Sequence, residues 1–529
     1  MRGRIFERTT PKAEGAGWWD GLYSHLFVLE LDSGRITRVT KGAWEITAPA
    51  WSPDGESLSF ISKRVHDARM DADLLHFADV YTVWHGGSDP VKITPSSLLV
   101  NQFVYSPDGQ QLTLIASDRK FGSSSHNRLY TVPVAGGTPK QVAPEVDMQF
   151  GNAALGDMKS TGTRLPPLYD RLNPQLGVYV LGTREGNVHV YRVDETGVCD
   201  RVTGGDGEKD IYQYTLSPDG RYLVVAALTA ERPGELYRVD VRTGEELRLT
   251  WRNDEFLAGL QIRVPERITF KASDGLDIHG WLLKPFELTY EKLVKVPLIL
   301  QIHGGPHAMY TGVFSLGMQT LAAQGYAVLW VNPRGSMGYG QDFVKACRGD
   351  FGGGDARDLL EAVDYVLAEF DFIDETRLGI GGGSYGGVMT NWIVAHTNRF
   401  RAAVTQRSIS NWLSLYGTSD IGISFVEDVI GGNLQDHAEL LWSKSPIAHA
   451  NRIDTPLLIL HGENDYRTPI SQAEELYTAL KRYGKTTRLI RYPESNHSLL
   501  KSGKPSLRID SFEQVNAWFG HYLHGQKPS

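Results

Sequence analysis

The sequence is poor in cysteine and in long apolar runs. Its 529 residues include only Cys199 and Cys347, far apart in the chain, so a disulfide framework is not expected and a reducing compartment fits best. No stretch approaches the roughly 18 apolar residues of a membrane helix, and the basic start of the chain lacks the apolar core of a signal peptide. We therefore expect a cytoplasmic protein with no membrane partner.

Blocks of like charge are also missing. The 62 acidic residues exceed the 54 basic ones, giving a formal net charge of −8, and no basic stripe suits phosphate groups. Nucleic acid is therefore not an expected partner. Hydrophobic residues make up 41% and charged residues 22%, an ordinary globular profile. The length exceeds what one hydrophobic core usually serves, so two or more domains are expected.

Repetition of short β-rich units marks the first half of the chain. Alternating segments recur at residues 25–34, 79–83, 128–132, 188–194 and 235–240. A Ser-Pro-Asp-Gly turn recurs at 52–55, 106–109 and 217–220, so its aspartates lie 54 and then 111 residues apart, about one and two periods. This pattern predicts an all-β propeller with about five recognisable blades over residues 1–260. A β-sandwich or solenoid with chance similarity of turns is the alternative.

The second half, residues 261–529, has a different pattern. A hairpin-like stretch at 267–282 leads into apolar strands that alternate with helical segments. The expected strands lie at 297–302, 327–331, 377–380, 402–405 and 456–460, with a further one at 487–492. Such alternation predicts a mostly parallel, doubly wound sheet covered on both faces.

One serine lies where such a sheet presents a nucleophile. Gly382-Gly383-Ser384-Tyr385-Gly386 follows the strand at 377–380 and precedes the helical run at 388–394. A Gly-x-Ser-x-Gly sequence between strand and helix is typical of the nucleophile elbow of α/β-hydrolases, in which small flanking residues allow a sharp turn. Ser384 is therefore the candidate nucleophile.

An alcohol needs a base, and the base needs an acid to orient it. In this fold the acid and then the histidine follow the serine along the chain. The strand at 456–460 runs into a loop that carries Glu463 and Asp465, of which we favour Asp465. The next strand ends before His497, which is the candidate base.

Negative charge that develops on a substrate carbonyl needs aimed N–H donors. The loop His303-Gly304-Gly305-Pro306 follows the strand at 297–302 and matches the hydrolase oxyanion loop in type and position. We expect one donor to be the backbone N–H of Tyr385 and the other that of Gly305 or Gly304. No cofactor and no metal are expected.

Together these residues resemble the prolyl oligopeptidase family of serine peptidases, and within it the acylaminoacyl-peptidase branch. Beyond the serine motif, the marks of the resemblance are the segments 303–307, 332–340, 349–353 and 461–467. The resemblance implies that Ser384, Asp465 and His497 form a catalytic triad, and that the propeller caps the site, admitting peptides and excluding folded proteins. It also implies that Arg467 reaches toward a substrate carbonyl, a role that suits the five donors of a guanidinium.

Two departures from the family qualify this expectation. His303 stands where other branches carry a tyrosine that completes the oxyanion hole, so the second donor should be a backbone group. Relatives also have more propeller sequence and an N-terminal helix, so we expect the propeller to be N-terminally incomplete.

The predicted function is a serine peptidase that hydrolyses short peptides, releasing N-acylated amino acids or acting as an oligopeptidase. An esterase or a dipeptidyl-peptidase-like hydrolase with the same triad is the alternative. A non-catalytic propeller scaffold is the alternative from another class. Trp412, Leu415 and Tyr416 are interpreted either as pocket lining or as core, and edge strands could support a homo-oligomer.

Replacement of Ser384 by alanine gives the first test. We expect the Ser384→Ala variant to fold, to lose activity, and to lose labelling by a fluorophosphonate, because only binding and oxyanion contributions remain. Intact-protein mass spectrometry measures the labelling. Stoichiometric labelling of the variant would contradict the assignment.

Overall fold

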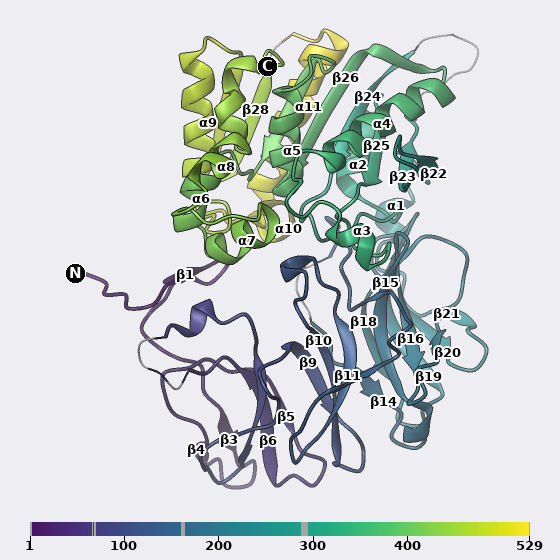
Figure 1. The fold of residues 1–529 in the computed structure, drawn as a ribbon. Helices are drawn as coiled ribbons and strands as arrows, with labels where there is room; N and C mark the ends of the chain where they lie inside the picture. The colour runs from purple at the N-terminus through teal and green to yellow at the C-terminus, as the bar shows by residue number, and fades with distance from the viewer. Residues whose placement is uncertain (1–2, 66, 68–69, 160–163, 287–294, 528–529) are drawn as a thin grey trace.

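The computed structural model describes residues 3–65, 67, 70–159, 164–286 and 295–527. Two parts follow one another along the chain (Figure 1). Antiparallel β-sheets form the first part, and a mixed sheet flanked by helices forms the second. No helix among these residues is both long and apolar enough to cross a membrane.

The first part is a series of small antiparallel sheets. The first elements are a two-stranded hairpin of β1 and β2 and another of β3 and β4, followed by two four-stranded sheets, β5–β8 and β9–β12. Their bounds are β1 Lys12–Ala13, β2 Gly17–Trp18, β3 Phe27–Leu29, β4 Ile36–Arg38, β5 Thr47–Trp51, β6 Ser57–Ser62, β7 Asp79–Trp84, β8 Val91–Lys92, β9 Leu99–Tyr105, β10 Gln111–Ser117, β11 Arg128–Pro133 and β12 Lys140–Val142.

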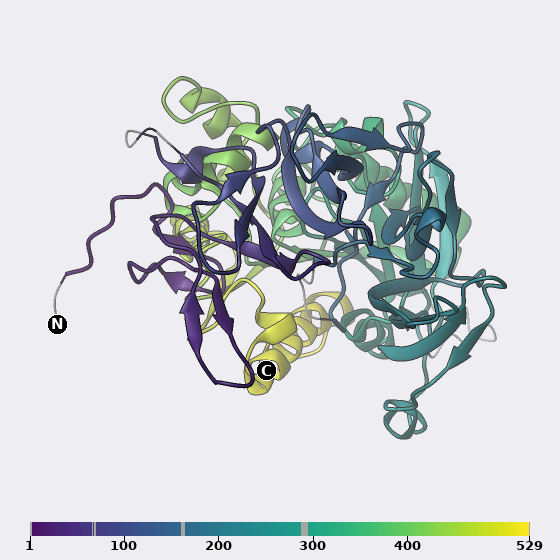
Figure 2. The same ribbon diagram turned by 90° about the horizontal axis from the view of Figure 1, so that it is seen from below.

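A nine-stranded sheet completes this part. A single parallel bridge, between Val188 and Asp210, joins its two antiparallel groups, β13–β17 and β18–β21. The bounds are β13 Gln149–Phe150, β14 Leu168–Tyr169, β15 Val178–Arg184, β16 Asn187–Val193, β17 Cys199–Arg201, β18 Lys209–Leu216, β19 Tyr222–Thr229, β20 Glu235–Asp240 and β21 Glu246–Arg248. The sheets follow one another around an arc from the purple hairpins to the teal strands (Figure 2). Within the described residues no strand pairing joins the first sheet to the last.

Each Ser-Pro-Asp-Gly repeat forms the turn between two neighbouring strands. In the first copy, the Ser52 hydroxyl donates to Asp54 at 2.6 Å, and Asp54 also accepts the N–H of Glu56. The glycine takes a positive φ in all three copies, 76°, 72° and 70°, which explains the residue type. The repeat read from the sequence is thus a repeated turn in the structure.

The second part is built on an eight-stranded sheet of order β22-β23-β25-β24-β26-β27-β28-β29. The two strand pairs that involve β23 are antiparallel, and the pairs from β25 to β29 are parallel. The bounds are β22 Glu266–Lys271, β23 Asp277–Leu283, β24 Val296–Ile302, β25 Ala327–Asn332, β26 Ile373–Gly383, β27 Ala402–Gln406, β28 Leu457–Gly462 and β29 Thr487–Tyr492. The predicted strands are present, and β26 is longer at both ends than expected.

Helices cover both faces of this sheet. Alternate residues of β24 belong to different cores: Leu298 and Leu300 pack with α4, α5 and α9, whereas Ile299 packs with α2 and α11. The helix bounds are α1 Asp254–Leu257, α2 Leu316–Ala323, α3 Gln341–Lys345, α4 Gly354–Glu369, α5 Tyr385–Val394, α6 Trp412–Thr418, α7 Gly422–Val429, α8 Ala438–Ser443, α9 Ser471–Arg482, α10 Leu499–Ser502 and α11 Pro505–His524. Burial on both faces explains why the parallel strands read as continuous apolar runs.

Polar contacts join the two parts. Asp157 of the β-sheet part accepts the Ser315 hydroxyl at 2.9 Å and the N–H of Gly317 at 2.7 Å, at the start of α2. Asp428 accepts the Arg119 guanidinium at 2.6 Å and the N–H of Ser123 at 2.9 Å. These contacts lie on the side of the helical part where the parallel strands end.

Candidate active site

Ser384 lies at the sharp turn between β26 and α5. Its φ of 60° and ψ of −121° are strained values for a residue with a side chain. Its backbone N–H donates to the carbonyl of Gln406, at the end of the neighbouring strand β27, at 3.0 Å. The serine is therefore held at the carboxyl edge of the parallel sheet, where ligands bind in folds of this type.

The glycines around Ser384 are required by close backbone contacts. A Cβ added to Gly382 would lie 2.7 Å from the carbonyl oxygens of Gly386 and Ile302, too close for any side chain. A Cβ at Gly386 would clash with Ile302 in the same way. Both positions can hold only glycine in this geometry, which gives the motif its physical meaning.

Asp465 and His497 are brought together by the loops that follow β28 and β29. His497 Nδ1 lies 2.8 Å from Asp465 Oδ2, and both side chains are almost fully buried, with 11% and 0% exposed. The alternative acid, Glu463, instead pairs with Arg491 at the surface, at 3.0 Å. Of the two carboxylates proposed from the sequence, the structure brings Asp465 to the histidine.

Thr468 ties this pair to the strand next to the serine. Its hydroxyl lies 2.9 Å from Asp465 Oδ2 and 3.1 Å from His497 Nδ1, and 3.0 Å from the carbonyl of Arg407. Arg407 follows Gln406, the residue that holds the N–H of Ser384. A short chain of contacts thus links the three predicted residues.

The loop predicted to hold an oxyanion lies against the serine. A Cβ at Gly304 would lie 3.5 Å from the Ser384 Cβ. The N–H of Tyr385 is the first of α5 and has no acceptor within the helix. His303 hydrogen-bonds Ser336 at 2.9 Å and the carbonyl of Gly304 at 2.6 Å, and burial lowers its pKa to about 4, so it is a neutral brace.

Tyr385 itself is anchored from below the elbow. Its hydroxyl donates to Asp355 at 2.9 Å, and Asp355 also accepts the N–H of Gly352 and of Ala356. Burial raises the pKa of Asp355 to about 7, and the hydrogen bond from Tyr385 opposes that rise. The anchor fixes the first turn of α5, which carries the serine.

Arg467 is held by an aspartate rather than left free. Its Nε and Nη2 donate to Asp420 at 2.7 and 3.0 Å, and its side chain is 35% exposed. This bidentate pair uses one edge of the guanidinium and leaves Nη1 for another acceptor. Of the two interpretations left open for Trp412, Leu415 and Tyr416, the structure fits core packing: the first two are 0% and 1% exposed, and Tyr416 packs part-buried against the same core.

Glu14, which no pattern in the sequence selects, contacts both the loop that carries Asp465 and the loop that carries His497. It lies in the turn between β1 and β2. Its carboxylate accepts the N–H of His497 at 2.7 Å, of Tyr466 at 2.9 Å and of Arg467 at 3.3 Å. The contact spans 483 residues of sequence, so no local pattern could have indicated it.

Burial dominates the electrostatics of this site. Burial and the nearby cations Arg407 and Arg467 lower the pKa of His497 well below its ordinary value. Burial raises the pKa of Asp465, and a hydrogen bond from Thr468 opposes that rise. Burial also raises the pKa of Glu14, with Asp465 adding to the rise.

We predict that Glu14→Gln loosens both loops. An amide cannot accept hydrogen bonds at both of its ends, and a charged hydrogen bond is worth about 1.5–3 kcal/mol, so exchange of the affected amides should quicken about ten- to 150-fold. Hydrogen–deuterium exchange of the segments 464–468 and 495–499 measures this. The control is Glu7→Gln, an exposed glutamate of the same segment. Equal exchange in the wild type and in Glu14→Gln would refute the idea that Glu14 holds the two loops in place.

Several known proteins are similar to this chain. The sequence model of the prolyl oligopeptidase family matches residues 313–526. The uncharacterized peptidase YuxL of Bacillus subtilis is 39% identical over 513 residues, which cover 97% of this chain and 76% of that protein. The human acylamino-acid-releasing enzyme is 34% identical over 258 residues, 47% of this chain and 34% of that enzyme.

A solved structure matches nearly the whole chain. The acylaminoacyl peptidase of Pyrococcus horikoshii superposes with a TM-score of 0.84 at 28% identity, covering 99% of this chain and 78% of that one. Both the sheet part and the helical part are therefore shared with an acylaminoacyl peptidase. Together with the 39% identity to YuxL over 97% of the sequence, this likeness identifies the chain as a serine peptidase of the prolyl oligopeptidase family.

Proposed function

We propose that Ser384 is the nucleophile of this peptidase, that His497 is its general base and that Asp465 orients the base. The observation that carries the proposal is the buried 2.8 Å hydrogen bond from His497 to Asp465, together with the strained turn that holds Ser384. In a neutral imidazole with Nδ1–H donated to a carboxylate, Nε2 carries the lone pair that a base needs.

The reaction then proceeds through an acyl-enzyme. Ser384 Oγ attacks the carbonyl carbon of the cleaved bond while His497 takes the hydroxyl proton. The C–N bond breaks, and His497 gives that proton to the leaving amine. Water repeats the sequence on the ester, with His497 again as base, and the acyl product leaves as a carboxylic acid.

Backbone donors are proposed to stabilise the oxyanion. The N–H of Tyr385 supplies one hydrogen bond and that of Gly305 or Gly304 the other. The place of Gly304 against the serine supports the second donor, and the absence of a tyrosine at position 303 leaves this role to the backbone. Removing one such donor costs about 10²–10³ in kcat in other hydrolases.

The proposed substrates are short peptides from which N-acylated amino acids are released. The likeness to acylamino-acid-releasing enzymes and to an acylaminoacyl peptidase supports this choice. We propose that residues 1–260 form a propeller with about five recognisable blades and that residues 261–529 form the hydrolase domain. The cytoplasmic location stays a prediction.

A substrate panel tests the specificity. We expect acyl-amino-acid anilides to be cleaved in preference to dipeptide anilides with a free amino group. A preference for the free dipeptides would indicate a dipeptidyl peptidase instead, and cleavage restricted to p-nitrophenyl esters would indicate an esterase.

The pH profile tests the role of His497. The base must be unprotonated, so activity falls as the pH drops through its pKa. Since burial and nearby cations lower that pKa, we expect the acid limb of kcat/KM to lie below about pH 6.5, the value for an unperturbed histidine. A limb midpoint at or above that value would contradict the buried, cation-flanked base.

Arg467→Lys tests the proposed contact with a substrate carbonyl. Lysine keeps the charge but loses the planar fork that Asp420 holds in place. A charged hydrogen bond is worth about 1.5–3 kcal/mol, so kcat/KM for acyl-peptides should fall about ten- to 150-fold, and that for small esters much less. The Asp420→Asn variant weakens the ion pair that holds Arg467 but keeps Arg467 itself, so its kcat/KM for acyl-peptides should also fall more than that for esters. Equal losses on esters and peptides would indicate a displaced Asp465 loop instead.

A further inference from the structure

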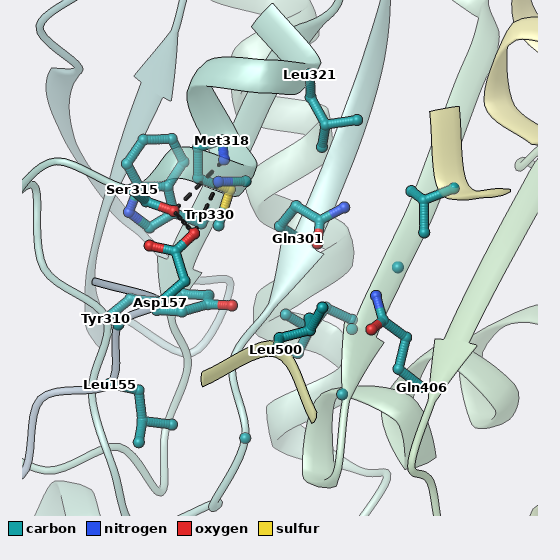
Figure 3. Close-up of a pocket in the computed structure, with 18 of the residues that line it drawn as sticks. Leu155, Asp157, Gln301, Tyr310, Ser315, Met318, Leu321, Trp330, Gln406 and Leu500 are labelled. Carbon is teal, nitrogen blue, oxygen red and sulfur yellow. Dashed lines mark hydrogen bonds between the residues drawn. The ribbon is translucent and has the colours of Figure 1, made fainter. Parts of the chain in front are cut away.

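A small cavity lies directly beside the serine, on the face of the sheet covered by α2 and α11. Its volume is about 150 Å³, and Gly304 and Gly383 form the wall nearest to Ser384. From there it extends toward Met318 and Leu321 of α2 (Figure 3), and Val515 of α11 also lines it. It is smaller than the roughly 300–1,000 Å³ of pockets that hold drug-sized ligands, so it suits a group of about one or two residues.

Polar side chains without protein partners line this cavity. They are Gln301, Tyr310, Gln406, Arg407 and Lys501. In the part of the chain that the structure describes, none of these side chains makes a hydrogen bond. Figure 3 shows the ends of Gln301, Gln406 and Tyr310 directed toward the same space. Each of these side chains is only partly buried, so their convergence on one space offers free donors and acceptors to a polar ligand.

The charges around the cavity favour an anion. The guanidinium of Arg407 lies against Gly383, where an added Cβ would be 2.9 Å from its Nε. Within the described residues, neither Arg407 nor Lys501 has a carboxylate at ion-pair distance. Asp157 also lines the cavity, but its carboxylate already accepts hydrogen bonds from the Ser315 hydroxyl and from the first N–H groups of α2.

Electrostatics agree with this geometry. Burial lowers the pKa of Arg407. Burial, with the charge of Arg407, lowers the pKa of Lys501 to about 7. The negative charges of Asp465 and Glu14 raise the pKa of Arg407, although neither carboxylate forms an ion pair with it. The charge of Asp157 likewise raises the pKa of Lys501 without an ion pair. A bound carboxylate would therefore supply the direct ion pair that both cations lack among the described residues.

The position of the cavity indicates which part of a substrate it faces. Leu500 and Lys501 line it and lie three and four residues after His497 in the chain, so the cavity lies on the side of the histidine. Arg407 is also close enough to act on the imidazole. The leaving amine receives its proton from the histidine and must therefore depart on this side.

We propose that this cavity binds the leaving part of the substrate and that Arg407 and Lys501 bind its C-terminal carboxylate. The inference rests on the proposed function, since it needs His497 to be the acid that protonates the leaving amine. It narrows the substrate class to acyl-peptides that end one or two residues after the cleaved bond. Gln301 and Gln406 are then available to the peptide group of the leaving residue.

Matched dipeptides test the proposal. N-acetyl-Xaa-Ala is offered as the free acid and as the C-terminal amide, with Ala, Leu and Phe at Xaa, and release of acetyl-Xaa is measured by mass spectrometry. Because a charged hydrogen bond contributes about 1.5–3 kcal/mol, the wild-type chain should favour the acid about ten- to 150-fold in kcat/KM. The ratio of acid to amide cancels any change in the chemical step.

Variants assign the preference to the two cations. Lys501→Gln and Arg407→Gln should each lower the ratio, the double variant should bring it close to one, and Lys501→Arg should keep most of it. The control is Lys504→Gln, whose exposed side chain pairs with Glu494 away from the cavity. Fluorophosphonate labelling at Ser384 verifies that each variant is folded.

The outcomes separate this inference from the proposed function. A wild-type ratio near one with rapid cleavage of acyl-amino-acid anilides overturns the inference alone. A preference for the acid that survives in the double variant also overturns it. Failure of the wild type to cleave the anilides as well as both dipeptides overturns the proposed function, and this inference with it.

Discussion

The hydrogen bond between His497 and Asp465 is the interaction on which the rest of the site depends. It joins the loops after β28 and β29, two neighbouring parallel strands whose register brings Gly462 opposite Tyr492. A buried carboxylate is costly unless its oxygens are paired. Asp465 meets this condition through the Thr468 hydroxyl, the N–H groups of Arg467 and Thr468, and the imidazole.

The β-sheet part contributes residues to this site. It contributes Glu14 to the N–H groups of both catalytic loops, Asp157 to the start of α2, and Leu155 to the cavity beside the serine. The loops of Asp465 and His497 and the cavity beside Ser384 therefore depend on contacts between segments hundreds of residues apart. A substitution in the hairpin of β1 and β2 can therefore alter the position of His497 through the direct contact of Glu14, with no change in the core of the second part.

Much of the hydrolase fold could be predicted from local patterns. Strands that are buried on both faces appear in the sequence as continuous apolar runs. The glycines at 382 and 386 mark the turn in the sequence because the backbone there leaves no room for a Cβ. The strand β26 extends beyond its predicted 377–380 core because the polar residues 374–376 continue its extended backbone. The sequence favoured Asp465 over Glu463 as the acid. In the structure Asp465 is buried against His497, whereas Glu463 pairs with Arg491.

Contacts distant in sequence could not be predicted. Glu14, Arg407 and Lys501 belong to no motif. Only the fold brings Glu14 to the loops of Asp465 and His497, and the two cations to the cavity. The pocket interpretation of Trp412 was open because an aromatic residue after a strand fits both a core and a pocket, and packing decided for the core. The repeats predicted strand groups and turns, but ring closure depends on contacts between the first and last sheets that no repeat encodes.

The most direct test of the account is detection of the acyl-enzyme. With a p-nitrophenyl ester of an N-acetyl amino acid, rapid mixing should give a burst of one nitrophenolate per chain. Acid quenching and peptide mapping should then place the acetyl-aminoacyl mass on the peptide that contains Ser384. An acyl group found on a side chain other than Ser384 would contradict the account. So would a His497 variant that still hydrolyses the ester with neither a burst nor an adduct.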